Sequence, residues 1–207
     1  PETLPDYNQY YKESSSRHDE PIEFDWASNL ARQIGTVVHR MLELLSDNVL
    51  RQPLAELNES AELFAKNQLK SLGVDNDDLV FSVQSVMKAL ETTLLSERGS
   101  WIFSEDHMLA DSELVLSCEI ADGSLQTAVL DRTFVGNAGV RWIIDYKTGT
   151  HSGSGLSEYL DSEERRYKPK LNHYADIMHQ ISPGPIKLGL YFPLLDAWRQ
   201  WDYPEST

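Results

Sequence analysis

Three charged side chains on two neighbouring predicted strands are the first candidates for chemistry. The segment 129–149 reads VLDRTFVGNAGVRWIIDYKTG and carries Asp131 in its first half, then Asp145 and Lys147 in its second. Side chains alternate between the two faces of a strand, so Asp145 and Lys147 share a face while Tyr146 points into the fold. Two carboxylates and an amine at a strand end can hold Mg²⁺ or Mn²⁺ beside an activated water.

The Asp-x-Lys tripeptide by itself is a weak signal, because it arises by chance about once in a chain of ordinary composition and this size. A solvated salt bridge at a strand end is the alternative interpretation of these residues alone. The elements that surround them therefore have to supply the context.

Alternating apolar and polar residues predict an antiparallel meander around these candidates. The turn signals are Asp122-Gly123 and the segment 136–139, and the predicted strands are 112–120, 125–135 and 140–147. The meander places Glu113 on the strand next to that of Asp131. The apolar run at 142–144 is typical of a central strand that is buried on both faces.

A crossover is predicted to follow the meander. After a Gly-rich loop at 148–155, a helix runs to about Gln180, with a restart at Pro169, and a fourth strand covers 186–193. A strand–helix–strand connection is right-handed, so the fourth strand is expected parallel to the third. Trp198 and Trp201 are interpreted as packing residues.

The N-terminal part is predicted to be helical. Residues 1–22 are expected to form a polar lead-in or linker, and a helix is expected to begin with Asp25 as its N-cap. On the edge of its apolar stripe, Gly35 and His39 lie one turn apart. A glycine in a helix interior usually has a packing reason, and here it lets another group approach close to His39. Two further helices, at 60–72 and 77–97, are interpreted as scaffold.

A basic, aromatic-containing cluster lies on the helix after the loop. Its members are Arg165, Arg166, Tyr167, Lys168 and Lys170. Lys170 and Tyr174 are four residues apart and share a helix face. The cluster is either a solvated face or a patch that guides a nucleic-acid strand.

Composition bounds the class of protein. The chain has 207 residues, 41% of them hydrophobic, and a net charge of -15. Such acidity argues against affinity that rests on phosphate neutralisation, yet acids at a metal site can still accept a phosphate through a cation. The single cysteine, Cys118, excludes an internal disulfide and favours the cytoplasm. No apolar run is long enough to cross a membrane, and a first residue other than Met suggests a piece of a longer protein.

Taken together and in order, these motifs resemble the PD-(D/E)XK nuclease domain of the RecB type. This domain stands at the C-terminus of the exonuclease V beta subunit, of AddA and of related UvrD/Rep-like helicases. The matching segments are GTVVHRMLE, SELVL, AVLDR, DYKT, KLNHYA and LGLYFPLL. Two positions depart from the family pattern, since Ala128 replaces a usual Gly and Lys170 replaces a usual Gln.

The resemblance implies a restriction-endonuclease-like α/β core over residues 23–207, with a mixed sheet and an N-terminal helical portion. It implies a DNA phosphodiesterase that uses Mg²⁺ or Mn²⁺ and serves recombination and double-strand-break repair. It also implies a helicase motor on the same polypeptide, because no ATPase motif is present here, and allows a second helicase-nuclease subunit. A cysteine-ligated iron–sulfur cluster is not expected with one cysteine.

The resemblance also assigns roles to residues. The implied metal ligands are His39, Asp131, Asp145 and the Tyr146 carbonyl. Lys147 is expected to orient the attacking water, with Glu113 in support, and substrate contacts are expected from Lys170, Tyr174, Arg165, Arg166 and Lys168. Two alternatives stay open. One is a nuclease-fold module that binds or senses a DNA strand without cutting it, and the other is an acidic interaction domain.

Overall fold

A computed structural model gives the fold of the chain and describes residues 22–47, 54–119, 125–151 and 153–204. The elements, in chain order, are α1 (Ile22–Ser46), α2 (Leu54–Ser71), α3 (Asn76–Leu95), α4 (Glu97–Ile102), β1 (Met108–Glu119), β2 (Leu125–Val135), η2 (Asn137–Gly139), β3 (Arg141–Tyr146), α5 (Leu156–Ile181), β4 (Ile186–Phe192) and β5 (Ala197–Asp202).

The strands form one five-stranded sheet in the order β1-β2-β3-β4-β5. β1, β2 and β3 pair antiparallel as a meander, β3 and β4 pair parallel, and β5 returns antiparallel to β4. The helix α5 makes the crossover between β3 and β4. The structure thus confirms the predicted α/β class, with its mixed sheet, meander, crossover and N-terminal helical portion.

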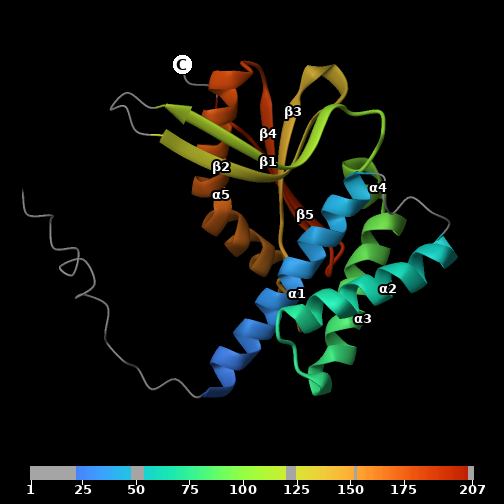
Figure 1. The fold of residues 1–207 in the computed structure, drawn as a ribbon. Coiled ribbons are helices and arrows are strands. Elements are labelled where there is room, and N and C mark those ends of the chain that lie inside the picture. Colours follow the sequence, from blue (N-terminus) through green and yellow to red (C-terminus); the bar gives the residue numbers. More distant parts are fainter. Residues whose placement is uncertain (1–21, 48–53, 120–124, 152, 205–207) are drawn as a thin grey trace, which may run out of the picture.

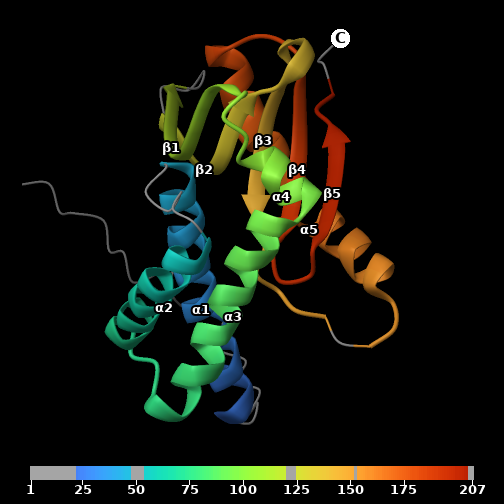
Figure 2. The ribbon, with the colours of Figure 1, turned by 90° about the vertical axis from the view of Figure 1, so that its right-hand side faces the viewer.

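Helices cover the two faces of the sheet (Figures 1 and 2). α5 packs on one face, where its Leu171 and Ala175 join Leu188 and Leu190 of β4 in one apolar cluster. On the other face, α1, α3 and α4 form a second cluster with Phe134. β3 contributes to both, because Ile143 belongs to the first cluster and Ile144 to the second. This double burial confirms β3 as a central strand.

Helix α1 brings an apolar stripe to the second cluster. Ile34, Val37, Val38, Met41, Leu42 and Leu45 are all buried, at the spacing that places them on one face of a helix. α2 ends at Ser71, and two residues later Gly73 has a φ of 85°, which suits a residue without a Cβ, as predicted for the glycine that terminates this helix. The stripe fixes the rotation of α1 and thereby the direction of its polar edge.

Several elements differ from the expectations. α2 begins at Leu54 and not at residue 60. α1 begins at Ile22, so Asp25 lies inside its first turn and is not the N-cap. α5 runs continuously through Pro169 without the expected restart, because packing of its apolar face outweighs the lost backbone hydrogen bond. The elements α4 and β5 were not predicted. The predicted turn at Asp122-Gly123 and the lead-in up to residue 21 lie outside the described residues.

In the described ranges, every helix is too short or too polar to serve as a membrane span.

Candidate active site

Glu113 and Asp131 lie at the same level of the two neighbouring strands β1 and β2. They fall between the ladder pairs Ser112–Arg132 and Leu114–Leu130. Glu113 has a φ of 50°, a left-handed conformation that a residue with a side chain adopts only under constraint. Backbone strain of this kind often accompanies functional sites, and here it stands beside two acids. Glu113 was expected near the start of its strand, but β1 begins at Met108.

His39 reaches this pair of acids from α1. Its Nδ1 lies 3.6 Å from Asp131 Oδ2, and its Nε2 lies 3.2 Å from the backbone carbonyl oxygen of Tyr146. When Nε2 carries the proton, that nitrogen donates to the carbonyl and Nδ1 turns its lone pair toward Asp131. A backbone carbonyl on one ring nitrogen is a common way to orient a metal-ligating histidine.

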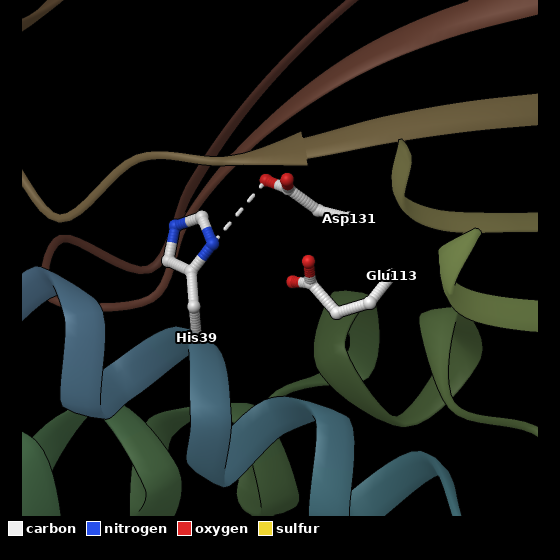
Figure 3. A group of neighbouring side chains, drawn as sticks. All are labelled: His39, Glu113 and Asp131. Atoms are coloured by element: carbon white, nitrogen blue, oxygen red, sulfur yellow. Dashed lines mark ion pairs between the residues drawn. The ribbon is translucent and has the colours of Figure 1, made fainter. Parts of the chain in front are cut away.

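Figure 3 shows His39, Glu113 and Asp131 facing one another from three different elements. One ligand atom from each residue lies within 4.8 Å of the other two. Carboxylate oxygens with one imidazole nitrogen suit a small divalent cation such as Mg²⁺ or Mn²⁺. The donor set therefore fits the predicted metal, with Glu113 closer to His39 and Asp131 than the sequence suggested.

Asp145 is held by two lysines. Its Oδ2 forms an ion pair with Lys147 Nζ, and its Oδ1 lies 3.0 Å from Lys170 Nζ. The carboxylate is only 3% exposed. A buried carboxylate needs compensating positive charge, and the two lysines supply it. Asp145 and Lys147 are thus in contact, as their spacing predicted.

The carboxylates of Asp131 and Asp145 also repel each other electrostatically. Burial, the largest cause, and the charge of Asp145 together raise the pKa of Asp131 from 3.8 to about 6, against the opposing effects of His39 and the Tyr146 amide. That amide donates to Asp131 Oδ2 at 2.7 Å. Burial also raises the pKa of Glu113. Neighbouring acids with raised pKa values are typical of a site that gains stability from a cation.

Lys170 stays charged at this position. Partial burial lowers its pKa, but the adjacent Asp145 carboxylate raises it, and the net pKa lies above the usual value for lysine. Lys147 in turn lies 3.7 Å from the centre of the Tyr167 ring. A cation over an aromatic face is stabilised there, so Lys147 is held by two partners.

The segment after β3 is fitted closely between α1 and α5. A Cβ on Gly35 would lie 2.7 Å from Thr148 Oγ1, and a Cβ on Gly149 would lie 2.4 Å from the Tyr159 hydroxyl oxygen. The sequence predicted that Gly35 permits a close approach near His39, and Thr148 is the group that approaches. The fit fixes the segment that carries Lys147 and the Tyr146 carbonyl.

A hollow of about 460 Å³ contains most of these groups. Besides His39, Asp131, Asp145, Tyr146, Lys147 and Lys170, it is lined by Arg32, Gly35, Thr148, Gly149, Tyr159, Glu163, Arg166 and Tyr167. Glu113 lines an adjoining hollow that shares Gly35 and His39.

The predicted basic cluster is divided by the structure. Arg166 and Lys170 line the hollow, whereas Arg165 and Lys168 do not. Lys168 instead lies 5.5 Å from the Trp201 ring and pairs with Glu164. The Lys170 ammonium lies 5.2 Å from the centre of the Tyr174 ring, but Tyr174 does not line the hollow. On a helix, neighbours in sequence point in different directions.

Three residues of the hollow, Arg32, Tyr159 and Glu163, were missed by the sequence analysis. Arg32 precedes Gly35 and His39 by three and seven residues, a helical spacing that identifies the same face of α1. Tyr159, which stacks on His151 with ring centres 5.1 Å apart, gave no signal beyond its aromatic character.

A mixed sheet whose neighbouring strands present acids and a lysine at one end defines an α/β protein of the restriction-endonuclease-like class. The chain belongs to the PD-(D/E)XK nuclease superfamily, whose family model it matches over residues 9–197. The match begins inside the segment expected to be a lead-in, and the domain boundary near residue 22 stays a prediction. A search of curated proteins found no significant match.

Proposed function

We propose that this nuclease domain hydrolyses DNA phosphodiester bonds with Mg²⁺ or Mn²⁺. The observation that carries the proposal is the convergence of His39, Glu113 and Asp131 beside the Asp145–Lys147 pair. His39, Asp131 and Asp145 would hold the cation, and the Tyr146 carbonyl is a further candidate ligand. A bound cation supplies charge for the scissile phosphate and acidifies a coordinated water.

Other residues of the site would orient the water, support the ligands and bind the phosphates. Lys147 would orient the attacking water and offset the negative charge that develops on the phosphate. Glu113 would support His39 and Asp131 from β1. Arg166 and Lys170, which line the hollow, would contact the phosphates on either side of the scissile bond.

A wider role follows from the resemblance of the motifs. We infer that the domain is of the RecB type, is joined to a UvrD/Rep-like helicase motor on its parent polypeptide, and acts in recombination and double-strand-break repair. A second helicase-nuclease subunit is an expected partner. The single cysteine supports a cytoplasmic location.

The test is cleavage of labelled linear single-stranded DNA with Mg²⁺, with Mn²⁺ and with a chelator. Lys147→Ala is expected to lower the cleavage rate by about 100-fold or more, because it removes a group that stabilises developing charge. Lys88→Ala, an exposed lysine on α3, is the matched control and is expected to cleave at the rate of the unchanged protein. Equal cleavage by Lys147→Ala, or cleavage in the chelator, would contradict the assignment.

A module that binds or senses a DNA strand without cutting is the second candidate. It is favoured by the contact of Lys170 with Asp145, which leaves the carboxylate neutralised by protein. Such a module would bind single-stranded DNA and show no turnover at any concentration of Mg²⁺ or Mn²⁺.

A further inference from the structure

The two lysines on Asp145 are held very differently. Lys147 is only 15% exposed and is fixed between the carboxylate and the Tyr167 ring. Lys170 is 44% exposed, on the wall of the open hollow that also contains Asp131 and His39. Its ammonium can therefore leave Asp145 and remain solvated, whereas that of Lys147 cannot leave without breaking two buried contacts.

Lys170 holds one oxygen of a carboxylate that the proposed function assigns to the cation. Because Lys147 takes the other oxygen, both oxygens of Asp145 already have a positive partner. A divalent cation at Asp145 has to displace one of these ammonium groups, and the exposed one is the easier to displace. Two positive charges cannot share one oxygen without strong repulsion.

We propose that Lys170 is a positioning residue that competes with the divalent cation for Asp145 and so weakens metal binding at the site. This inference rests on the proposed function, since it takes Asp145 as a ligand. It assigns to Lys170 a role distinct from the substrate contact expected from the sequence. The cation enters as the Lys170 ammonium moves off Oδ1 into the hollow.

The test measures metal binding alone, without DNA. Mn²⁺ affinity of the whole chain is determined by electron paramagnetic resonance for the unchanged protein, Lys170→Gln and Arg166→Gln. Lys170→Gln is expected to bind Mn²⁺ about five- to tenfold more tightly, because a partly exposed ion pair no longer has to be broken. Arg166→Gln removes one positive charge from the same hollow without freeing Asp145, and it is expected to change the affinity less than about twofold.

Two results would overturn the proposal. One is an affinity of Lys170→Gln equal to or weaker than that of the unchanged protein. The other is an equal gain in both variants, which would mean that only the net charge of the hollow matters. NMR gives an independent readout. The signal of the Lys170 side chain is assigned as the one that is missing from the spectrum of Lys170→Gln. In the unchanged protein this signal is expected to shift when Mg²⁺ saturates the site. A signal that stays in place while Mg²⁺ binds would also contradict the displacement.

These outcomes are separable from failure of the proposed function. If no variant cleaves DNA but Lys170→Gln binds Mn²⁺ more tightly, the nuclease assignment fails and the competition stands. If all variants cleave and Mn²⁺ affinity is unaffected by Lys170, the competition fails and the nuclease assignment stands.

Discussion

The surroundings of Asp131 favour the binding of a cation. The carboxyl is nearly buried, lies next to the acid Asp145, and has His39 and one backbone amide as its favourable partners. Its pKa of about 6 shows that the charged form is disfavoured in the folded, metal-free protein. A cation would reverse this balance, since it stabilises the ionised form.

The stability of the metal-free protein is therefore expected to depend on the charge of Asp131. The folded state takes up the proton near pH 6 and the unfolded state near pH 3.8, so this carboxyl contributes stability that is complete below 3.8 and lost as the pH rises through 6. Asp131→Asn, which is always neutral, is expected to be more stable than the unchanged protein above pH 6 by roughly 1 to 3 kcal/mol.

Urea unfolding in a chelator between pH 4 and pH 8 measures this difference. The gain of Asp131→Asn is expected to shrink as the pH falls toward 4, because the native carboxyl is then neutral as well. A gain that is the same at every pH would show that packing and not ionisation is responsible. Addition of Mg²⁺ at pH 7.5 is expected to stabilise the unchanged protein but not the variant.

The connection from β3 to α5 determines the geometry of the site more than either element alone. It is fitted against α1 through Gly35 and Thr148, and against α5 through Gly149 and Tyr159. The side chains and carbonyls that this segment presents are thus fixed by two helices that are far apart in the sequence. Substitutions at Gly35 and Gly149 are therefore expected to disturb the active-site geometry, although neither residue is a proposed ligand of the cation.

Gly35→Ala tests this arrangement on α1. The added methyl group would meet Thr148 Oγ1 at 2.7 Å, so Thr148 has to move and Lys147 with it. Cleavage is expected to fall by about tenfold or more, because small misplacements of catalytic groups are costly, although alanine favours the helix by about 1 kcal/mol.

The double variant Gly35→Ala/Thr148→Ala is the matched rescue. Without the hydroxyl oxygen, the nearest atom of residue 148 is its Cβ, at an ordinary contact of 3.9 Å. The double variant is expected to recover most of the activity lost in Gly35→Ala, relative to Thr148→Ala alone. If the double variant did not recover activity, the loss in Gly35→Ala would have a cause other than the contact with Thr148.

Pro169 provides a second test at the level of a single helix. It lies inside α5, directly before Lys170, and its ring nitrogen cannot donate to the carbonyl of Arg165. Pro169→Ala is expected to raise the free energy of unfolding by roughly 1 to 3 kcal/mol. Gln180→Ala, at an exposed position of the same helix, is the control and is expected to change stability by less than about 0.5 kcal/mol. A destabilised Pro169→Ala would mean that a bend at this position is required.

The sequence predicted the order of the long elements and singled out most of the residues that line the hollow. Periodicity located α1, α3 and the strands β1 to β4, because these elements bury continuous stripes such as Val37, Met41 and Leu45. It could not predict that Lys170 reaches Asp145, since that contact joins residues 25 positions apart through the packing of α5 on the sheet. Nor does any local signal reveal the left-handed backbone of Glu113, which depends on the β1–β2 register.

The whole molecule is acidic, and its proposed DNA site is nearly balanced in charge. The chain carries a net charge of -15. The hollow is lined by four cationic side chains, Arg32, Lys147, Arg166 and Lys170, and by three acids, Asp131, Asp145 and Glu163. Both lysines are already paired with Asp145. Affinity for a phosphate is therefore expected to depend on an added cation.

Fluorescence anisotropy with a phosphorothioate oligonucleotide measures this dependence. Binding is expected in Mg²⁺ and is expected to weaken by about tenfold or more in a chelator. In Mg²⁺, the logarithm of the affinity is expected to fall with the logarithm of the salt concentration with a slope of about -2 or shallower, as for a few phosphate contacts. Tight binding in the chelator with a steep slope would instead indicate that DNA phosphates are bound by cationic side chains outside the hollow.

The proposed ligands join one helix to the sheet. His39 belongs to α1, whereas Asp131 lies on β2 and Asp145 on β3. A bound ion would thus link α1 to two strands that α1 otherwise contacts through side-chain packing. Amide exchange in α1 is then expected to slow when the ion is present, and to slow more than exchange in α5, so that the ion would stabilise the fold as well as the phosphate-binding site.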